Sequence, residues 1–359
     1  MRYLSEFRIG TRRIAIDAPT YFIADIAANH DGDLERAKDL IWQAKSAGAD
    51  VAKFQHFQAK RIVSDVGFTD DTIGKASHQA TWSRSVSETY DHYHTRRDWT
   101  EALVQTCAEA GIEFMTTPYD VEAVQIFSSI VNAYKIGSGD ITFASLIEEI
   151  ARQGRPVLLA TGAATMAEVE RAVTRCLRIN PELCLMQCNT NYTGSRENFG
   201  SVNLRVLETF ARYWPGLPLG FSDHTPGHSA VLGAVAIGAR VIEKHFTDDN
   251  NREGPDHAFA MNPVTWPTMV EATRELEIAL GDGIKRIETN ENETVVIQRR
   301  ALRAVTSLAA GTILSESHLE ALRPCPGDAV TPDRLDEVLG RRIKVDLPQG
   351  KELTWRNLA

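Results

Sequence analysis

The sequence predicts a closed (β/α)8 barrel followed by a small β-rich domain. Eight short apolar runs recur between residues 20 and 246, with amphipathic segments between or after them. The runs are continuously apolar, which is typical of parallel strands buried on both faces of a sheet. Eight strand-and-helix units are the number that closes into a barrel. After about Gln298 the pattern changes to short strands and turns.

The eight apolar runs are the expected barrel strands. They lie at residues 20–28, 50–55, 112–117, 132–138, 155–162, 182–188, 218–223 and 240–246. Helical segments follow several of them, for example at 33–49, 166–179 and 266–280. A doubly wound open sheet is the structural alternative. That fold favours a glycine-rich turn after its first strand, and the Ala-Ala-Asn-His-Asp-Gly at 27–32 is not a GxGxxG motif.

Segments outside the repeating units predict three further features. Residues 6–16 are expected to form a short hairpin before the barrel. The long polar and aromatic gap at 57–97 is expected to be a lid over the active face, as long barrel insertions often are. In the tail, the Gly311, Leu314 and Leu319 pattern recurs as Gly350, Leu353 and Leu358, which indicates two similar units. The predicted domains are a barrel at 1–285, a linker at 286–297 and a β-rich domain at 298–359.

Composition and charge exclude several classes of protein. The formal net charge is -9, which argues against a nucleic-acid-binding protein but allows a local site for an anionic substrate. Five cysteines without a CxxC pair are typical of a reduced, cytoplasmic protein. The sequence shows no signal-peptide pattern at its start and no apolar run of about 18 residues that would cross a membrane.

Polar side chains gather where the predicted strands end, which is where barrel enzymes place their functional groups. Lys53 and Lys135 lie inside strands that should be buried, where an ammonium group needs an anionic partner. Structural salt bridges would satisfy each lysine separately. Two lysines at the same end of one barrel favour a shared anionic ligand, and a phosphorylated substrate is the natural candidate. The hydroxyl groups of Ser138, Thr161 and Ser222 are candidate additional donors.

Two histidines and two carboxylates complete the candidate site. His224 and His245 end the seventh and eighth strands, so their imidazoles are expected to converge and to bind a divalent transition metal ion. The alternative is that either is an ordinary core or loop histidine. Asp25 and Asp256 are candidate acid–base groups, and Glu243 is a candidate partner that orients a ligand.

At these residues the sequence resembles the sialic acid synthase family, which includes bacterial N-acetylneuraminate synthases and their legionaminic and pseudaminic acid relatives. The resemblance covers nearly the whole chain in order, and the tail resembles the family's antifreeze-like (SAF) domain. The matching blocks are IADIAANHDGDLERA, VAKFQ, AYKIGSGD, ATG, SDHTPGH, GAVAIGARVIEKHFT, GPDHAFAMNP, RRALRAV and AAGTILSESHL.

The resemblance implies a reaction and a set of roles. Phosphoenolpyruvate condenses with an open-chain N-acylated hexosamine, such as N-acetylmannosamine, and with water, giving a nonulosonic acid and phosphate. His224 and His245 would hold Mn²⁺ or a similar ion, with Mg²⁺ or Co²⁺ as alternatives. Tyr192 and Asp256 would contact the sugar, and Asp25 stands where the family usually has Glu, near the reacting carbons. The residues implied for phosphoenolpyruvate are Lys53, Gln55, Thr117, Lys135, Ser138 and Ser222.

Departures from the family pattern concern mainly the acceptor sugar. Thr190 stands where well-known members have an asparagine near the phosphate, so Asn189 or Asn191 is the candidate replacement. Arg323 matches an arginine that reaches across a dimer to the acyl group of the sugar, but it is followed by two extra residues. The resemblance also implies a head-to-tail, domain-swapped homodimer. A metal-dependent sugar aldolase and a non-catalytic sugar-binding protein are the alternative functions.

Overall fold

The computed structural model describes residues 2–68, 79, 82 and 84–359 of the chain. The chain divides into two compact units, Met1–Gly281 and Asp282–Ala359, and each is described by itself. In the described part of the chain, no helix is both long enough and apolar enough to cross a membrane.

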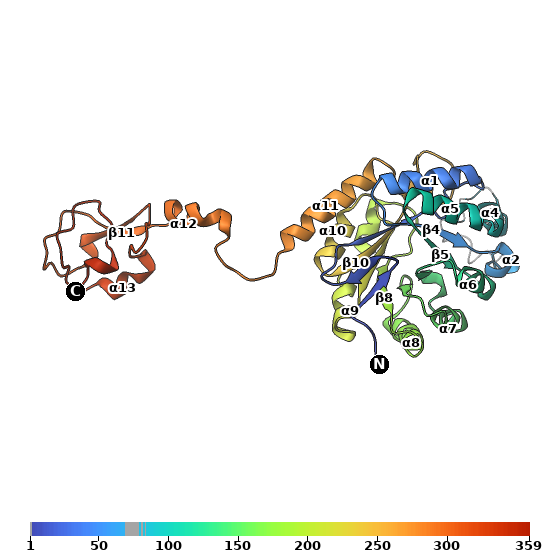
Figure 1. Ribbon diagram of the computed structural model, residues 1–359, viewed down its shortest axis with the longest axis horizontal. Coiled ribbons are helices and arrows are strands. Elements are labelled where there is room, and N and C mark those ends of the chain that lie inside the picture. The colour runs from blue at the N-terminus through green and yellow to red at the C-terminus, as the bar shows by residue number, and fades with distance from the viewer. Residues whose placement is uncertain (1, 69–78, 80–81, 83) are drawn as a thin grey trace. The chain divides into compact units, whose positions relative to one another are not determined.

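The first unit is a closed barrel of eight parallel strands (Figure 1). Its strands are β3 (Tyr21–Asp25), β4 (Val51–His56), β5 (Glu113–Pro118), β6 (Tyr134–Ile136), β7 (Val157–Ala160), β8 (Leu183–Cys188), β9 (Leu219–Asp223) and β10 (Ala239–His245). β10 pairs with β3 and closes the barrel. Each strand falls on one of the eight predicted apolar runs, so the predicted fold class is confirmed and the open sheet is excluded.

Helices surround the barrel, as Figure 1 shows. They are α1 (Leu34–Ser46), α5 (Thr100–Ala110), α6 (Val121–Phe127), α7 (Ala144–Arg152), α8 (Met166–Leu177), α9 (Val206–Tyr213), α10 (Ser229–Ala236) and α11 (Thr265–Leu280). Local sequence sets where they begin. Asp33 caps α1 by accepting from two backbone N–H groups, and Thr165 with Glu168 forms a capping box at the start of α8.

The barrel interior has an apolar layer and a polar layer because strand side chains alternate with a period of two. At the amino-terminal end, Ile23, Val51 and Met115 belong to one buried apolar cluster. The hairpin of β1 (Glu6–Ile9) and β2 (Arg12–Ala15) contributes Phe7, Ile9 and Ile14 to the same cluster, so the predicted hairpin is confirmed. Two residues further along the same three strands stand Asp25, Lys53 and Thr117, which places polar groups at the carboxyl end.

The insertion between β4 and β5 contains α2 (Ala59–Ile62), α3 (Asp65–Phe68), α4 (Val86–Tyr93) and the 3₁₀ turn η3 (Arg97–Trp99). A capping box of Ser85 and Glu88 begins α4. Part of the expected lid, at 69–78, 80–81 and 83, lies outside the described residues. Arg97 forms an ion pair with Asp120 at 2.8 Å, which ties the end of the insertion to the loop after β5.

The second unit has its own small core around Leu314, Val330 and Leu353. It contains α12 (Asn292–Gln298), the antiparallel pair β11 (Ala301–Ala304) and β12 (Leu319–Leu322), and α13 (Leu335–Val338). The segment expected to be a linker thus includes most of a short helix. Single-turn 3₁₀ helices and isolated bridges make up much of the rest.

Hydrogen bonds confirm the predicted internal echo of the tail. The N–H of Leu308 donates to the carbonyl of Leu347 at 2.8 Å, and the reverse bond has the same length. The N–H of Gly311 donates to Ile343, and that of Gly350 donates to Ala304, both at 2.8 Å. Both glycines have positive φ, a conformation that glycine adopts without strain. The two halves therefore exchange equivalent bonds, as two units related by an approximate two-fold axis do.

Candidate active site

Four charged side chains meet inside the barrel at the carboxyl ends of its strands. The Nζ of Lys53 lies 2.7 Å from the Oδ2 of Asp25 and 3.8 Å from the Oε2 of Glu243. The Nζ of Lys135 lies 3.2 Å from the Oε1 of Glu243. All four side chains are at least 94% buried, since the most exposed of them is only 6% accessible. Each lysine thus has a carboxylate partner, so the salt bridges that the sequence analysis gave as one explanation of the buried lysines are present.

This quartet is electrically balanced, and the pKa values of Asp25, Glu243 and Lys53 are shifted by their neighbours. Burial raises the pKa of Asp25, but Lys53, His245 and Gln55 together lower it further and hold it below its ordinary value. Glu243 behaves in the same way, with Lys135 and Lys53 lowering its pKa against burial. Burial lowers the pKa of Lys53, and the two carboxylates raise it above its usual range. The site therefore holds two lysine side chains paired with two carboxylates, and a phosphate or carboxylate group of a ligand can compete for the same lysines.

Hydroxyl and amide groups surround the quartet. Thr117 accepts a bond from Lys53 at 3.2 Å, Ser222 donates to Glu243 at 2.9 Å, and the Nε2 of Gln55 donates to Asp25 at 2.9 Å. Ser138 accepts from the N–H of Gly162 at 3.0 Å. Thr161 instead donates to the carbonyl of Met186, a bond between neighbouring strands. The structure thus brings the predicted donors to one end of the barrel, with Thr161 engaged in the wall.

The two predicted histidines converge. Their ring centroids are 5.3 Å apart, and the ring of Tyr192 lies 4.4 Å from that of His224. The Nδ1 of His224 lies 2.9 Å from the carbonyl of Asn189, which leaves its Nε2 free of that bond. The Nδ1 of His245 is 3.5 Å from the Oδ2 of Asp256 and is buried without a hydrogen-bond partner.

The histidine pair fits a metal that takes only two ligands from the protein. Among the described residues, no group of three or more His, Cys, Asp or Glu side chains is arranged to hold an ion. Two imidazoles, one with an unsatisfied buried nitrogen, are suitable ligands for a borderline divalent ion such as Mn²⁺, whose other positions substrate and water would fill. The oxygen atom Oδ1 of Asp25 is also buried without a partner close by.

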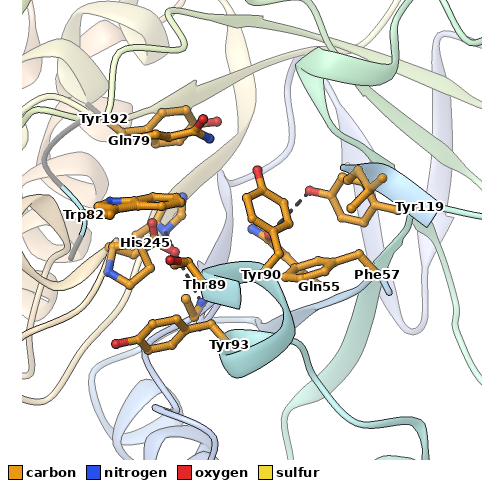
Figure 2. Close-up of a pocket in the computed structure, with 14 residues that line it drawn as sticks. Gln55, Phe57, Gln79, Trp82, Thr89, Tyr90, Tyr93, Tyr119, Tyr192 and His245 are labelled. Atoms are coloured by element: carbon orange, nitrogen blue, oxygen red, sulfur yellow. Dashed lines mark hydrogen bonds and ion pairs between the residues drawn. The ribbon is translucent and has the colours of Figure 1, made fainter. Parts of the chain in front are cut away.

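A pocket opens beside these residues (Figure 2). His245, Asp256 and Gln55 contribute to it from the barrel, and Tyr90 and Tyr93 contribute from α4. The remaining lining residues are Ala28, Phe57, Ile62, Gln79, Trp82, Thr89, Tyr119, Tyr192 and Pro255. The described part of the insertion therefore lies over the active face, as expected for a lid.

Sequence reasoning named Tyr192 but missed the other tyrosines, Phe57 and Trp82 of this pocket. Tyr119 directly follows β5, and its hydroxyl donates to the Oε1 of Gln55 at 3.4 Å. Tyr90 and Trp82 belong to the aromatic stretch of the insertion, which marked the segment but not the individual side chains. Their position depends on how the insertion folds back, and no strand pattern records that.

Two further candidates, Asn189 and Asn191, lie in the loop after β8. Asn189 donates through Nδ2 to the carbonyl of Ser201, and Asn191 accepts from Thr193, so both amides are engaged within the loop after β8. Thr190, by contrast, has its methyl group 2.6 Å from the place that a Cβ on Gly162 would occupy. Arg323 is exposed in the second unit, and its reach toward a partner's sugar site stays a prediction.

The closed barrel and the polar constellation at its carboxyl end define a protein of the (β/α)8-barrel enzyme class. The chain belongs to the NeuB family, whose model matches residues 40–285. The SAF domain matches residues 299–359. Both parts of the resemblance seen in the sequence are thereby confirmed.

Named relatives span nearly the whole chain. The N,N'-diacetyllegionaminic acid synthase of Legionella pneumophila is 33% identical over 94% of each chain. The human N-acetylneuraminate-9-phosphate synthase is 30% identical over 92% of this chain and 90% of its own. A crystal structure of the sialic acid synthetase of Leptospira borgpetersenii, in complex with citrate, matches with a TM-score of 0.71 and 27% identity, covering 81% of this chain and 95% of that one.

Proposed function

We propose that this protein is a nonulosonic acid synthase that condenses phosphoenolpyruvate with an open-chain N-acylated hexosamine and water, releasing phosphate. The observation that carries the proposal is the buried quartet of Asp25, Lys53, Lys135 and Glu243 beside a converging histidine pair. Family membership supports the synthase class, since relatives are named as synthases of legionaminic and N-acetylneuraminic acids or their phosphates.

On the donor side, Lys53 and Lys135 bind the phosphate and carboxylate groups of phosphoenolpyruvate. Binding draws the ammonium groups from Asp25 and Glu243, so these carboxylates become available to orient groups or accept protons. Ser138, Ser222, Thr117 and Gln55 supply hydrogen-bond donors to the same anion. Carbon 3 of phosphoenolpyruvate then attacks the aldehyde of the sugar, water adds at carbon 2, and phosphate leaves through cleavage of the C–O bond.

His224 and His245 hold a divalent ion, Mn²⁺ in the first place, with Mg²⁺ or Co²⁺ as alternatives. When bound, such an ion supplies Lewis-acid polarisation of the aldehyde. Asp256 and Tyr192 orient the sugar beside it. Asp25 holds Lys53 at 2.7 Å and stands near the reacting carbons, one bond shorter than the glutamate usual in the family.

The acceptor occupies the pocket of Figure 2. Aromatic faces from Tyr90 and Trp82 suit the apolar C–H groups and acyl methyl groups of a sugar, whereas Asp256 suits its hydroxyl and amide N–H groups. N-acetylmannosamine and the diacetamido sugars of legionaminic- and pseudaminic-type synthesis are the acceptors proposed. In a domain-swapped homodimer, Arg323 from a partner subunit completes the acceptor pocket. A cytoplasmic location stays a prediction.

The test is phosphate release from phosphoenolpyruvate with a panel of N-acyl hexosamines. We expect release only when a sugar and a divalent ion are both present. EDTA should abolish it, Mn²⁺ should restore it, and His224→Ala should bind less metal in a direct metal analysis. A sugar-dependent C–C bond formed from pyruvate, without phosphate release, would instead favour a metal-dependent aldolase. Folded, metal-loaded protein that is inactive with all sugars would contradict the proposal.

A further inference from the structure

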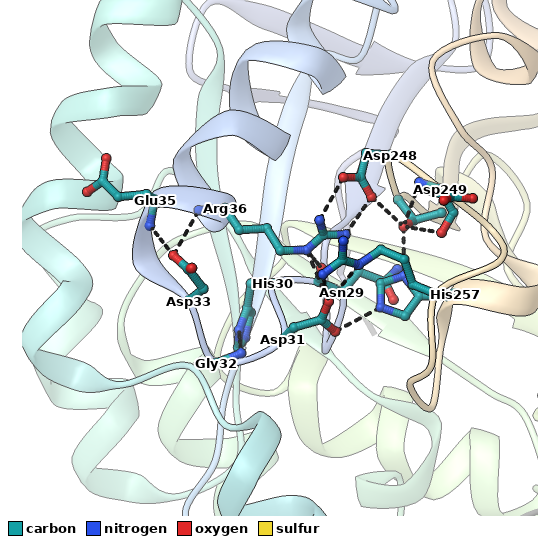
Figure 3. A network of polar contacts seen from close by, with 12 residues as sticks. Asn29, His30, Asp31, Gly32, Asp33, Glu35, Arg36, Asp248, Asp249 and His257 are labelled. Carbon is teal, nitrogen blue, oxygen red and sulfur yellow. Dashed lines mark hydrogen bonds and ion pairs between the residues drawn. The ribbon is translucent and has the colours of Figure 1, made fainter.

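A network of polar contacts outside the pocket joins the loop after β3 to the loop after β10 (Figure 3). Its centre is His257, which is fully buried in the 3₁₀ turn η6 (His257–Phe259). The Nε2 of His257 lies 2.8 Å from the Oδ1 of Asp31, and its Nδ1 lies 2.7 Å from the hydroxyl of Thr247. Both ring nitrogens of a buried histidine are thus satisfied, one by each loop.

Asp31 also pairs with two arginines, Arg36 of α1 and Arg252 of the loop after β10. Its Oδ2 accepts from the Nε of Arg252 at 2.9 Å and lies 3.2 Å from the Nε of Arg36. Arg36 in turn makes a two-pronged ion pair with Asp248, at 2.5 and 2.6 Å. Such paired, forked contacts fix orientation as well as distance. The backbone of Asp31 has a φ of +53°, a region that aspartate and asparagine tolerate better than most residues.

The chain packs closely against the ring of His257. A Cβ added to Gly254 would stand 2.6 Å from the Cδ2 of the imidazole, so the chain passes directly against the ring. The carbonyl of His257 also accepts from the Nδ2 of Asn250 at 2.8 Å. In contrast, residues 251–254 are exposed and have no apolar core of their own to hold them. The position of this loop therefore depends on the polar network.

The residue that precedes His257 is Asp256, which lines the pocket. Its Oδ2 lies 3.3 Å from the N–H of Ala28 and 3.5 Å from the Nδ1 of His245. Both atoms belong to the segments that the network joins. A small shift of the loop would move this carboxylate away from the pocket and from His245.

We infer that Asp31 and His257 form a positioning pair that holds Asp256 at the acceptor pocket, and that they act on the acceptor step without touching either substrate. The inference rests on the proposed function only for the identity of the acceptor. The placement of Asp256 by the pair is a property of the fold, and it has a readout that does not require turnover.

The first experiment measures hydrogen–deuterium exchange in residues 247–262 of the full-length protein. We expect slow exchange in the wild type and at least tenfold faster exchange in Asp31→Asn, which keeps the size and the backbone tolerance but removes the charge. Glu253→Gln, an exposed charge removal in the same loop, is the control and should leave exchange unchanged. Equal protection in Asp31→Asn and wild type would overturn the inference, whether or not an acceptor has been found.

The second experiment uses two substitutions of His257 with different reach. Glutamine extends about as far as Nε2 and can still bond Asp31, whereas asparagine reaches only about as far as Nδ1 and Thr247. We expect His257→Asn and Asp31→Asn to raise the KM for the sugar at least tenfold, with the KM for phosphoenolpyruvate nearly unchanged. His257→Gln should give a KM for the sugar close to that of the wild type. A uniform fall in kcat with both KM values unchanged would contradict a positioning role. Inactive wild-type protein would count against the proposed function, and the exchange result would still decide the inference.

Discussion

Individual side chains in this barrel show how burial decides what a charge can do. Lys53 and Lys135 were predicted from sequence to need an anion, because an unpaired buried ammonium is costly. The structure supplies Asp25 and Glu243 as partners, which the sequence could not assign, since pairing depends on strand register and on which side chains point inward. The lysines are thus satisfied before any ligand arrives, and a bound anion would exchange partners with the carboxylates.

Lys135→Met should destabilise the protein by about 3 kcal/mol, because it leaves Glu243 buried with only the more distant Lys53 as its cation. Urea denaturation measures this. The double variant Lys135→Met, Glu243→Gln should recover part of the stability but should keep a KM for phosphoenolpyruvate at least tenfold above wild type. Recovery of wild-type KM in the double variant would show that Lys135 does not bind the donor.

A buried histidine predicts how stability depends on pH. Burial lowers the pKa of His56 to about 3, and its ring packs 4.3 Å from that of Phe127. The unfolded chain protonates this group near pH 6.5, whereas the folded protein does not until about pH 3. Its contribution is therefore fully present above pH 6.5 and is lost as the pH falls, by about 1.4 kcal/mol per pH unit.

His56→Gln should accordingly flatten the stability profile between pH 6 and pH 4 relative to wild type, by roughly that slope. Urea midpoints at several pH values test it, and the difference between the two proteins cancels the contribution of the carboxylates. Parallel profiles would mean that His56 is protonated in the folded state.

At the scale of elements, the barrel strands could be read from sequence and the loops could not. Parallel strands buried on both faces give continuous apolar runs, so all eight were found. The polar residues at their ends followed from the same pattern. Asn189 and Asn191 lie in a loop after β8, where local hydrogen bonds rather than strand geometry set direction, and their amides serve that loop. The sequence likewise does not predict which aromatic side chains of the insertion line the pocket.

Gly162, after β7, is closely surrounded by side chains of neighbouring segments. A Cβ there would meet Thr190 at 2.6 Å, the Oγ of Ser138 at 2.9 Å and the Sγ of Cys188 at 3.2 Å. Gly162→Ala should therefore displace Ser138 and raise the KM for phosphoenolpyruvate about tenfold or more. Gly139→Ala is the matched control, since nothing lies within 4 Å of its added methyl group. Equal KM values in the two variants would show that the Ser138 contact is unimportant for the donor.

For the whole molecule, separate cores imply separate folding. The buried apolar residues of the barrel form clusters within the first unit, whereas Leu314, Val330 and Leu353 belong to a core wholly within the second unit. The sequence predicted a boundary near residue 285 from the change of pattern, and the chain divides after Gly281. What the sequence could not supply is the arrangement of a partner subunit, on which the role of Arg323 depends.

A truncated protein that ends at Gly281 should still fold and bind phosphoenolpyruvate, because the quartet and the histidine pair lie entirely in the first unit. In the truncated protein the KM for the sugar should rise and turnover should fall strongly. Arg323→Ala in the full chain should reproduce the rise in the KM for the sugar. Circular dichroism and isothermal titration of the shortened protein measure the first two properties. Loss of phosphoenolpyruvate binding in a folded barrel would mean that the second unit contributes to the donor site.

The most direct test of the proposed reaction uses phosphoenolpyruvate labelled with ¹⁸O at the bridging oxygen, with an N-acyl hexosamine and Mn²⁺, and mass spectrometry of both products. The proposal predicts that the label leaves with phosphate and that a nonulosonic acid forms in equal amount, because carbon 2 loses the C–O bond. Label retained in the keto acid or in pyruvate, with unlabelled phosphate, would show P–O cleavage and would contradict the proposal.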